Sequence, residues 1–109
     1  RGLGDVYKRQ GLFTYYKELS DKGDVFAQSY LAYFLSEGIG CERDFTMAHK
    51  YLLLAVERGD KETQFSLGEM YLCGVGCEKN IELSRKYYKL AADQGYEKAK
   101  VALTSISTH

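Results

Sequence analysis

The sequence has no net charge, no proline, no tryptophan and no long apolar run. Its 15 basic residues balance 15 acidic ones, so no global electric field draws the protein to nucleic acid or to acidic lipid. The longest apolar stretch, "YLLLAV" at residues 51–56, is far too short to cross a bilayer, which argues against direct membrane insertion. The 109 residues, 45% of them hydrophobic and 28% charged, are typical of one small globular domain or part of a larger one.

The first ten residues look foreign to the rest of the chain. The stretch "RGLGDVYKRQ" resembles the translated end of a transposase-type sequencing-library adapter. We therefore interpret residues 1–10 as a non-native segment to be excluded from fold reasoning, although Gly2 and Gly4 fall in phase with glycines of the repeat described next. Without it, the chain has 12 basic and 14 acidic residues, which still argues against nucleic acid as a partner. The opening gives no indication of localisation.

One loop occurs twice. "GIGCERDF" begins at Gly38 and "GVGCEKNI" begins at Gly74, 36 residues later. When residues 24–59 are laid over residues 60–95, a dozen positions are identical and no insertion is needed. Residues 11–23 before this pair and residues 96–109 after it continue the same phase. The chain is therefore predicted to contain two full repeats, preceded by the second helix of a truncated repeat and followed by a half repeat or capping helix.

Each repeat is predicted to form two helices, because its apolar residues recur at helical spacing. The predicted core of the first repeat comprises Ala27, Leu31, Phe34, Leu35, Ala48, Tyr51, Leu52 and Ala55. In the second repeat it comprises Leu67, Met70, Tyr71, Ser84, Tyr87, Tyr88 and Ala91, and Tyr15 is expected to fill the core before the first repeat. One such pair cannot bury its apolar face alone, so the predicted fold is an all-α solenoid of stacked antiparallel helix pairs.

Polar residues and glycines mark the helix ends. The predicted N-caps are Asp24, Asp44, Asp60 and Asn80, whose side chains can accept hydrogen bonds from the first turn. Gly38 and Gly74 are predicted to end the first helix of each repeat in the left-handed conformation. The same loop is therefore needed twice, once for each helix pair.

These residues resemble the Sel-one-like repeat, a relative of the tetratricopeptide repeat. The matching stretches are "AQSYLAYFLSEGIGCERDFTMAHKYLLLAVERG" and "TQFSLGEMYLCGVGCEKNIELSRKYYKLAADQG". Leu35 stands where the family usually has tyrosine, Thr63 and Ser84 stand where it has alanine, and cysteine replaces valine at two positions. No glycine hinge is lost, so the resemblance implies the same helical fold.

No catalytic, cofactor or metal site is predicted. Cys41 and Cys77 are interpreted as small buried hydrophobic residues, although a Cys73–Cys77 bridge stays open as an alternative. The spacing of Cys73 and Cys77 is loose for zinc, and His49 reads as a solvated helix position. A nucleophilic pair of Cys41 and His49 would need a cleft, which a loop cysteine facing the core does not offer. The glycines of the loops follow helices rather than strands, so they do not form phosphate cradles.

Aromatic residues provide the remaining signal. A second stripe on the first helices carries Phe26, Ser29, Tyr33 and Ser36, then Glu62, Phe65, Glu69 and Leu72, then Lys98 and Val101. In the related tetratricopeptide fold this stripe lines a concave surface that grips a peptide or a helix. By that resemblance, Phe26, Tyr33, Phe65 and Glu69 are the candidate partner-binding residues.

The leading hypothesis is a non-catalytic scaffold that binds a protein or peptide and takes no small-molecule substrate. Two alternatives remain. The resemblance implies that the chain could be a weak hydrolase, as in the disulfide-rich branch of the family, or a structural spacer in a longer array of repeats. Neither position of the family's cysteine pairs is a cysteine here, which argues against the hydrolase. The phase also suggests a fragment whose first helix would expose Leu12, Tyr15, Tyr16 and Leu19.

Overall fold

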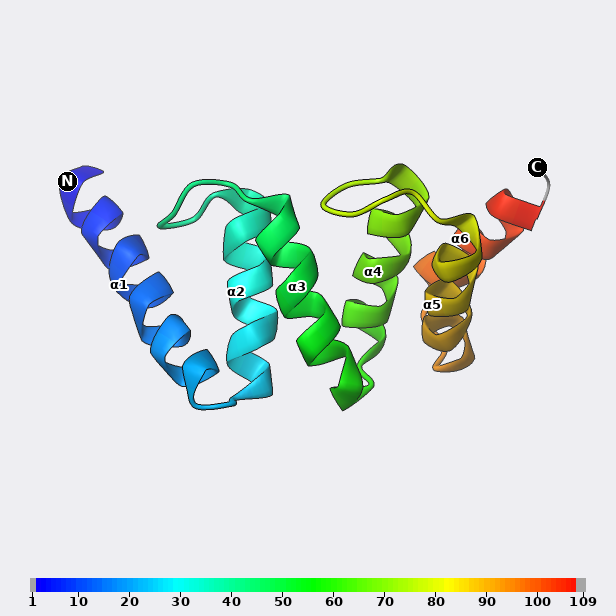
Figure 1. Cartoon of the computed structure of the whole chain (residues 1–109), viewed down its shortest axis with the longest axis horizontal. Coiled ribbons are helices and arrows are strands. Elements are labelled where there is room, and N and C mark those ends of the chain that lie inside the picture. Colours follow the sequence, from blue (N-terminus) through cyan, green and yellow to red (C-terminus); the bar gives the residue numbers. More distant parts are fainter. Residues whose placement is uncertain (1, 108–109) are drawn as a thin grey trace. The chain divides into compact units, whose positions relative to one another are not determined.

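The computed structural model describes residues 2–107, with side chains described from residue 11 to residue 106. The helices are α1 (Gly2–Asp21), α2 (Val25–Glu37), α3 (Phe45–Ala55), α4 (Lys61–Cys73), α5 (Ile81–Asp93) and α6 (Glu97–Ser107), with a short 3-10 turn, η1 (Val56–Arg58), after α3. No strand occurs within residues 2–107, which confirms the predicted all-α class. The chain divides into a first unit, Arg1–Ala55, with α1 to α3, and a second unit, Val56–His109, with α4 to α6 (Figure 1).

The helix ends form where the sequence predicts them. The Asp24 carboxylate accepts a hydrogen bond from the Ala27 amide at 3.0 Å, and the Asn80 side chain accepts one from Leu83 at 3.0 Å. Asp44 and Asp60 cap in the same manner. Gly38 and Gly74, each with φ of 70°, close α2 and α4 in the left-handed region, which glycine reaches without steric cost. Identical local chemistry therefore produces the same turn in both repeats.

The first unit packs α2 against α1 on one side and against α3 on the other (Figure 1). All eight residues predicted for the core of the first repeat are buried. Tyr15 is 56% exposed, so the prediction that it fills the core was wrong. Of the four residues that the first helix was expected to expose, Leu12 and Tyr15 are exposed, whereas Tyr16 and Leu19 are half-buried. The equivalent Tyr51 on α3 is only 9% exposed, so the same repeat position is open in one helix and buried in another. The residues 1–10 that we interpret as adapter-derived lie outside the described side chains, and their origin remains a prediction.

The second unit has a core of Tyr88, Ala91, Ala99 and Ile106, with α5 packed between α4 and α6. Tyr88 is only 2% exposed, and its ring lies directly against the backbone of α4 at Gly68. Beside it, the Ser84 hydroxyl donates a 2.7 Å hydrogen bond to the Gly68 carbonyl, which satisfies a polar group that is completely buried. A glycine on α4 thus makes room for the largest buried side chain of this unit.

A glutamine amide joins the two ends of the second repeat. Gln94 donates through Nε2 to the Gly59 carbonyl at 2.7 Å and to Gln64 Oε1 at 2.8 Å. Gln28 is the equivalent of Gln64 in the first repeat and is also buried, but its Oε1 accepts no hydrogen bond from the described residues. The position equivalent to Gln94 is Arg58, whose guanidinium instead pairs with Asp60 at 2.8 Å.

Candidate partner-binding surface

Two candidate residues on α2 are open to solvent. Phe26 is 61% exposed and Tyr33 is 56% exposed, whereas Leu31 on the same helix is completely buried. The difference follows from helical geometry, because residues separated by three or four positions share a face and the intervening ones point elsewhere. We use the name first-helix stripe for Phe26 and Tyr33 on α2 in the first unit together with the residues Phe65 and Glu69 on α4 in the second unit. In the first unit this stripe is aromatic and accessible.

Sequence reasoning missed a third exposed aromatic residue, Tyr30. Its side chain is 50% exposed, and its ring centroid lies 4.9 Å from that of Tyr16 on α1. Tyr16 also lies 5.3 Å from Tyr15 and 5.8 Å from Phe34, so the two helices share an aromatic cluster. The repeat pattern hid Tyr30 because its equivalents are Ser66 and Ala102, which carry no aromatic ring.

Phe65 lies in a different environment from Phe26 and Tyr33. It is half-buried and packs against the core of the second unit, with ring centroids 5.4 Å from Tyr88 and 5.1 Å from Tyr96. Most of its surface therefore contributes to folding, and only its outer edge is open to a partner.

Glu69 adds a charge to the stripe on α4. The residue is exposed overall, yet partial burial of its carboxyl group raises its pKa, an effect that the nearby Lys98 ammonium opposes. Burial raises the pKa of Tyr88 to about 12, and the neighbouring Glu69 carboxylate acts in the same direction. The stripe of the second unit therefore combines a half-buried aromatic ring with an exposed carboxyl group.

The three cysteines are free thiols, and His49 lies on α3. All three cysteines are free, so the Cys73–Cys77 alternative is not formed. Cys41 and Cys77 are half-buried rather than buried as predicted, and burial raises the pKa of both thiols. His49 is half-buried, not solvated as predicted, and burial lowers its pKa. A thiol held in its protonated form is a poor nucleophile.

A pocket in the second unit was not predicted either. It has a volume of about 600 Å³ and lies between the C-terminal halves of α4 and α6 and the start of α5. Its lining comprises Leu72, Lys79, Ile81, Arg85, Ala102, Ser105 and Ile106. A sequence signal did exist. The second repeat has Lys79, Ile81 and Arg85 at the positions where the first repeat has Arg43, Phe45 and His49, so an apolar residue lies between two nitrogen-bearing side chains in both repeats.

Within the described part of the chain, no three side chains of the kinds that bind metal ions gather in one place. None of the helices described here is long and apolar enough to span a membrane.

Paired helices with repeated glycine turns and an exposed stripe on the first helix define a helical repeat protein. The profile of the Sel1 repeat family matches residues 25–60 and again residues 61–96. The chain therefore belongs to the Sel1 repeat family, as the sequence resemblance implied. The fold of this family is generally a protein-interaction scaffold.

Solved structures show the same fold. A protective antigen of uropathogenic Escherichia coli strains that displays an SLR fold is similar with a TM-score of 0.81 and 28% identity, over 86% of this chain and 20% of that one. A Sel1 repeat protein from Oxalobacter formigenes is similar with a TM-score of 0.78 and 30% identity, over 84% of this chain and 69% of that one. Cysteine-rich protein B of Helicobacter pylori is similar with a TM-score of 0.75 and 26% identity, over 86% and 71%.

The chain thus spans one fifth of the length of the Escherichia coli antigen and about seven tenths of the other two proteins. No curated protein matches the chain. The fold class is the α/α solenoid that the repeats predicted.

Proposed function

We propose that this protein is a non-catalytic adaptor that binds a protein or peptide partner through the first-helix stripe. The observation that carries the proposal is the contrast between the two faces of α2. One face is buried in the core, while Phe26, Tyr30 and Tyr33 are each at least half exposed on the other side. Large aromatic side chains at this exposure are typical anchors of protein interfaces, where their burial in a complex supplies much of the binding energy.

The four candidate residues have different roles in this proposal. Phe26 and Tyr33 are the apolar anchors, because binding would remove most of their remaining surface from water. Phe65 offers an edge already fixed by the rings of Tyr88 and Tyr96, so it would lose little conformational freedom on binding. Glu69 supplies a carboxylate that favours a basic or hydrogen-bond-donating group on the partner.

The hydrolase alternative has weaker support. Cys41 lies on the loop after α2, and its Sγ donates to the Phe34 carbonyl at 3.6 Å. A nucleophilic cysteine needs a base within hydrogen-bond reach and a lowered pKa, whereas burial raises the pKa of this thiol. A panel of ester and lactam substrates, with Cys41→Ser as the control, tests this alternative directly.

The adaptor function is tested by comparing the proteins that immobilised variants retain. Tyr33→Ala and Phe26→Ala should each lose partners that the unmodified chain retains. Leu54→Ala is the matched control, because Leu54 is 54% exposed and lies on α3, outside the stripe. Equal retention of every protein by all four chains would contradict the proposal.

Stability measurements separate a binding role from a folding role for Tyr33. Substitution of an exposed side chain usually changes the free energy of unfolding by no more than about 0.5 kcal/mol, so Tyr33→Ala should melt close to the unmodified chain. A fall of several degrees in melting temperature would show that Tyr33 belongs to the core.

A further inference from the structure

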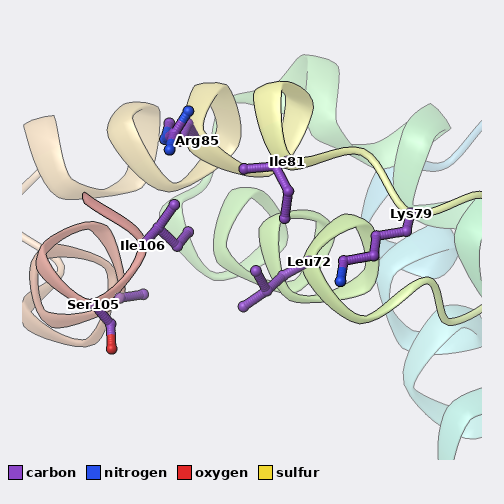
Figure 2. A pocket seen from close by; sticks show the side chains of 7 residues that line it. Leu72, Lys79, Ile81, Arg85, Ser105 and Ile106 are labelled. Atoms are coloured by element: carbon purple, nitrogen blue, oxygen red, sulfur yellow. The ribbon is translucent and has the colours of Figure 1, made fainter. Parts of the chain in front are cut away.

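The pocket of the second unit combines an apolar floor with a basic rim. Figure 2 shows the side chains of Leu72, Ile81 and Ile106 around the cavity, with those of Lys79 and Arg85 on opposite sides of it. Ile106 belongs to the buried core cluster, and Leu72, Ile81 and Ala102 pack against that cluster. An apolar side chain entering the cavity would therefore extend an existing core rather than create a new one.

The two cations of the rim have no acidic counterpart in the pocket. No aspartate or glutamate lines the cavity, and neither Lys79 nor Arg85 forms an ion pair with a described side chain. The equivalent loop in the first repeat differs, because the Arg43 guanidinium lies over the Phe45 ring at 5.7 Å from its centroid. Ile81 replaces that ring in the second repeat, so Lys79 lacks the aromatic face that Arg43 contacts.

We propose that this pocket binds an acidic and hydrophobic segment of a partner protein, with a large aliphatic side chain in the cavity and a side-chain carboxylate against each cation. The inference rests on the proposed adaptor function and adds the chemistry of the partner. Charge complementarity favours this occupant, because the positive rim and the apolar floor together select an apolar residue flanked by acids. Placement of the cations on opposite sides favours two separate carboxylates over a single terminal one.

The geometry of an extended chain sets the spacing of the ligand. Residues two positions apart lie on the same face of an extended segment, so the sequence Glu-Gly-Leu-Gly-Glu presents both carboxylates and the leucine together. A fluorescein-labelled, C-terminally amidated peptide with this core is the probe. Its counterparts are Lys-Gly-Leu-Gly-Lys and Gln-Gly-Leu-Gly-Gln.

Fluorescence anisotropy with the full chain should give saturable binding of the acidic peptide with a Kd below about 1 mM, and weaker binding at higher salt. Lys79→Glu and Arg85→Glu should each weaken it by about tenfold, and the double variant should prefer the lysine peptide instead. The matched control is Lys86→Glu, which makes the same charge change on α5 next to Arg85 but outside the pocket. All substituted side chains are exposed, and circular dichroism verifies that the variants fold.

Three results of the peptide titrations would overturn the inference: no saturation with the acidic peptide, equal binding of the glutamine peptide, or equal loss of affinity in the Lys86 variant. A concentration-dependent dimer that Lys79→Glu dissolves would assign the pocket to a second copy of the chain and would also overturn it. If the acidic peptide does not bind but Tyr33→Ala loses partners that the unmodified chain retains, the proposed ligand of the pocket is wrong and the adaptor function is still supported. Failure of both would reject the adaptor function.

Discussion

The contact between Gly68 and Tyr88 allows a quantitative test of the packing. A Cβ atom added at Gly68 would lie 2.6 Å from Cδ1 and 2.7 Å from Cε1 of the Tyr88 ring. The ring cannot easily retreat, because it is 2% exposed and Phe65 lies against it with a centroid distance of 5.4 Å. Gly68→Ala therefore forces either the ring or α4 to move.

The expected cost is the difference between two opposing effects. Overpacking of a well-filled core costs about 1–3 kcal/mol, and the fixed ring places this site at the upper end. Alanine gains about 1 kcal/mol over glycine in a helix interior, so the net loss of unfolding free energy should be about 2 kcal/mol. For a chain of this size, such a loss lowers the melting temperature by about 10 °C.

A double substitution provides the internal control. The first repeat has Ala32 and Leu52 at the positions of Gly68 and Tyr88, and both of these residues are buried there. The chain Gly68→Ala/Tyr88→Leu imports that pair, so the alanine should cost little in the presence of the leucine. Urea unfolding of all four chains should give a favourable coupling energy of at least about 1 kcal/mol. Additive effects, or an unchanged stability of Gly68→Ala, would refute the argument.

Three further predictions concern charge and backbone. In Asp60, burial opposes ionisation, but hydrogen bonds from Thr63 and Arg58 and the Arg58 charge outweigh it and lower the pKa. The stabilisation by this carboxylate is complete above about pH 3.9 and is lost as the pH falls through the folded-state pKa. Asp60→Asn should therefore be less stable than the unmodified chain at pH 7, and the difference in stability should disappear in acid. The pKa of Glu69 is shifted in the opposite direction, so its ionised carboxylate destabilises the fold. Glu69→Gln should therefore be more stable than the unmodified chain at pH 7, and the difference should vanish below about pH 4.3. Melting temperatures equal to that of the unmodified chain across the pH range would contradict both pH predictions. Gly74→Ala should lose about 1–2 kcal/mol, because it forces φ of 70° on alanine. Gly11→Ala in α1 should gain up to about 1 kcal/mol in urea unfolding, because the new Cβ would meet no described atom within 4 Å beyond the adjoining backbone of its own helix. A loss at Gly11 as large as that at Gly74 would refute the distinction.

Features that depend on a few neighbouring residues were predictable from the sequence. The caps at Asp24 and Asn80 and the turns at Gly38 and Gly74 depend only on local hydrogen bonds and local backbone conformation. The core of the first repeat followed from helical spacing for the same reason, since each helix face is set by residues three and four positions apart.

Features that depend on neighbouring helices were not predictable from the repeat pattern. Phe65 and Tyr33 lie on the same predicted stripe, but Tyr96 on α6 and Tyr88 on α5 hold Phe65, whereas Tyr33 is open to solvent. The alignment of the repeats made Tyr15 equivalent to the buried Tyr51, and only the place of α1 in the phase of the repeats pointed to its exposure. His49 was misplaced for a similar reason, because a polar residue at a helical position can be half-buried by the elements around it.

The glutamine amides give the two repeats unequal resistance to opening. In the second repeat, Gln94 donates a hydrogen bond to the side-chain oxygen of Gln64. In the first repeat, the side-chain oxygen of Gln28 is buried and accepts no hydrogen bond from the described residues. An unsatisfied buried acceptor costs about 1–3 kcal/mol, and that energy is recovered when the helix around it detaches. Thermal fluctuations should therefore detach α2 more often than α4, so the backbone amides of α2 should exchange with deuterium sooner and a protease should cut there first.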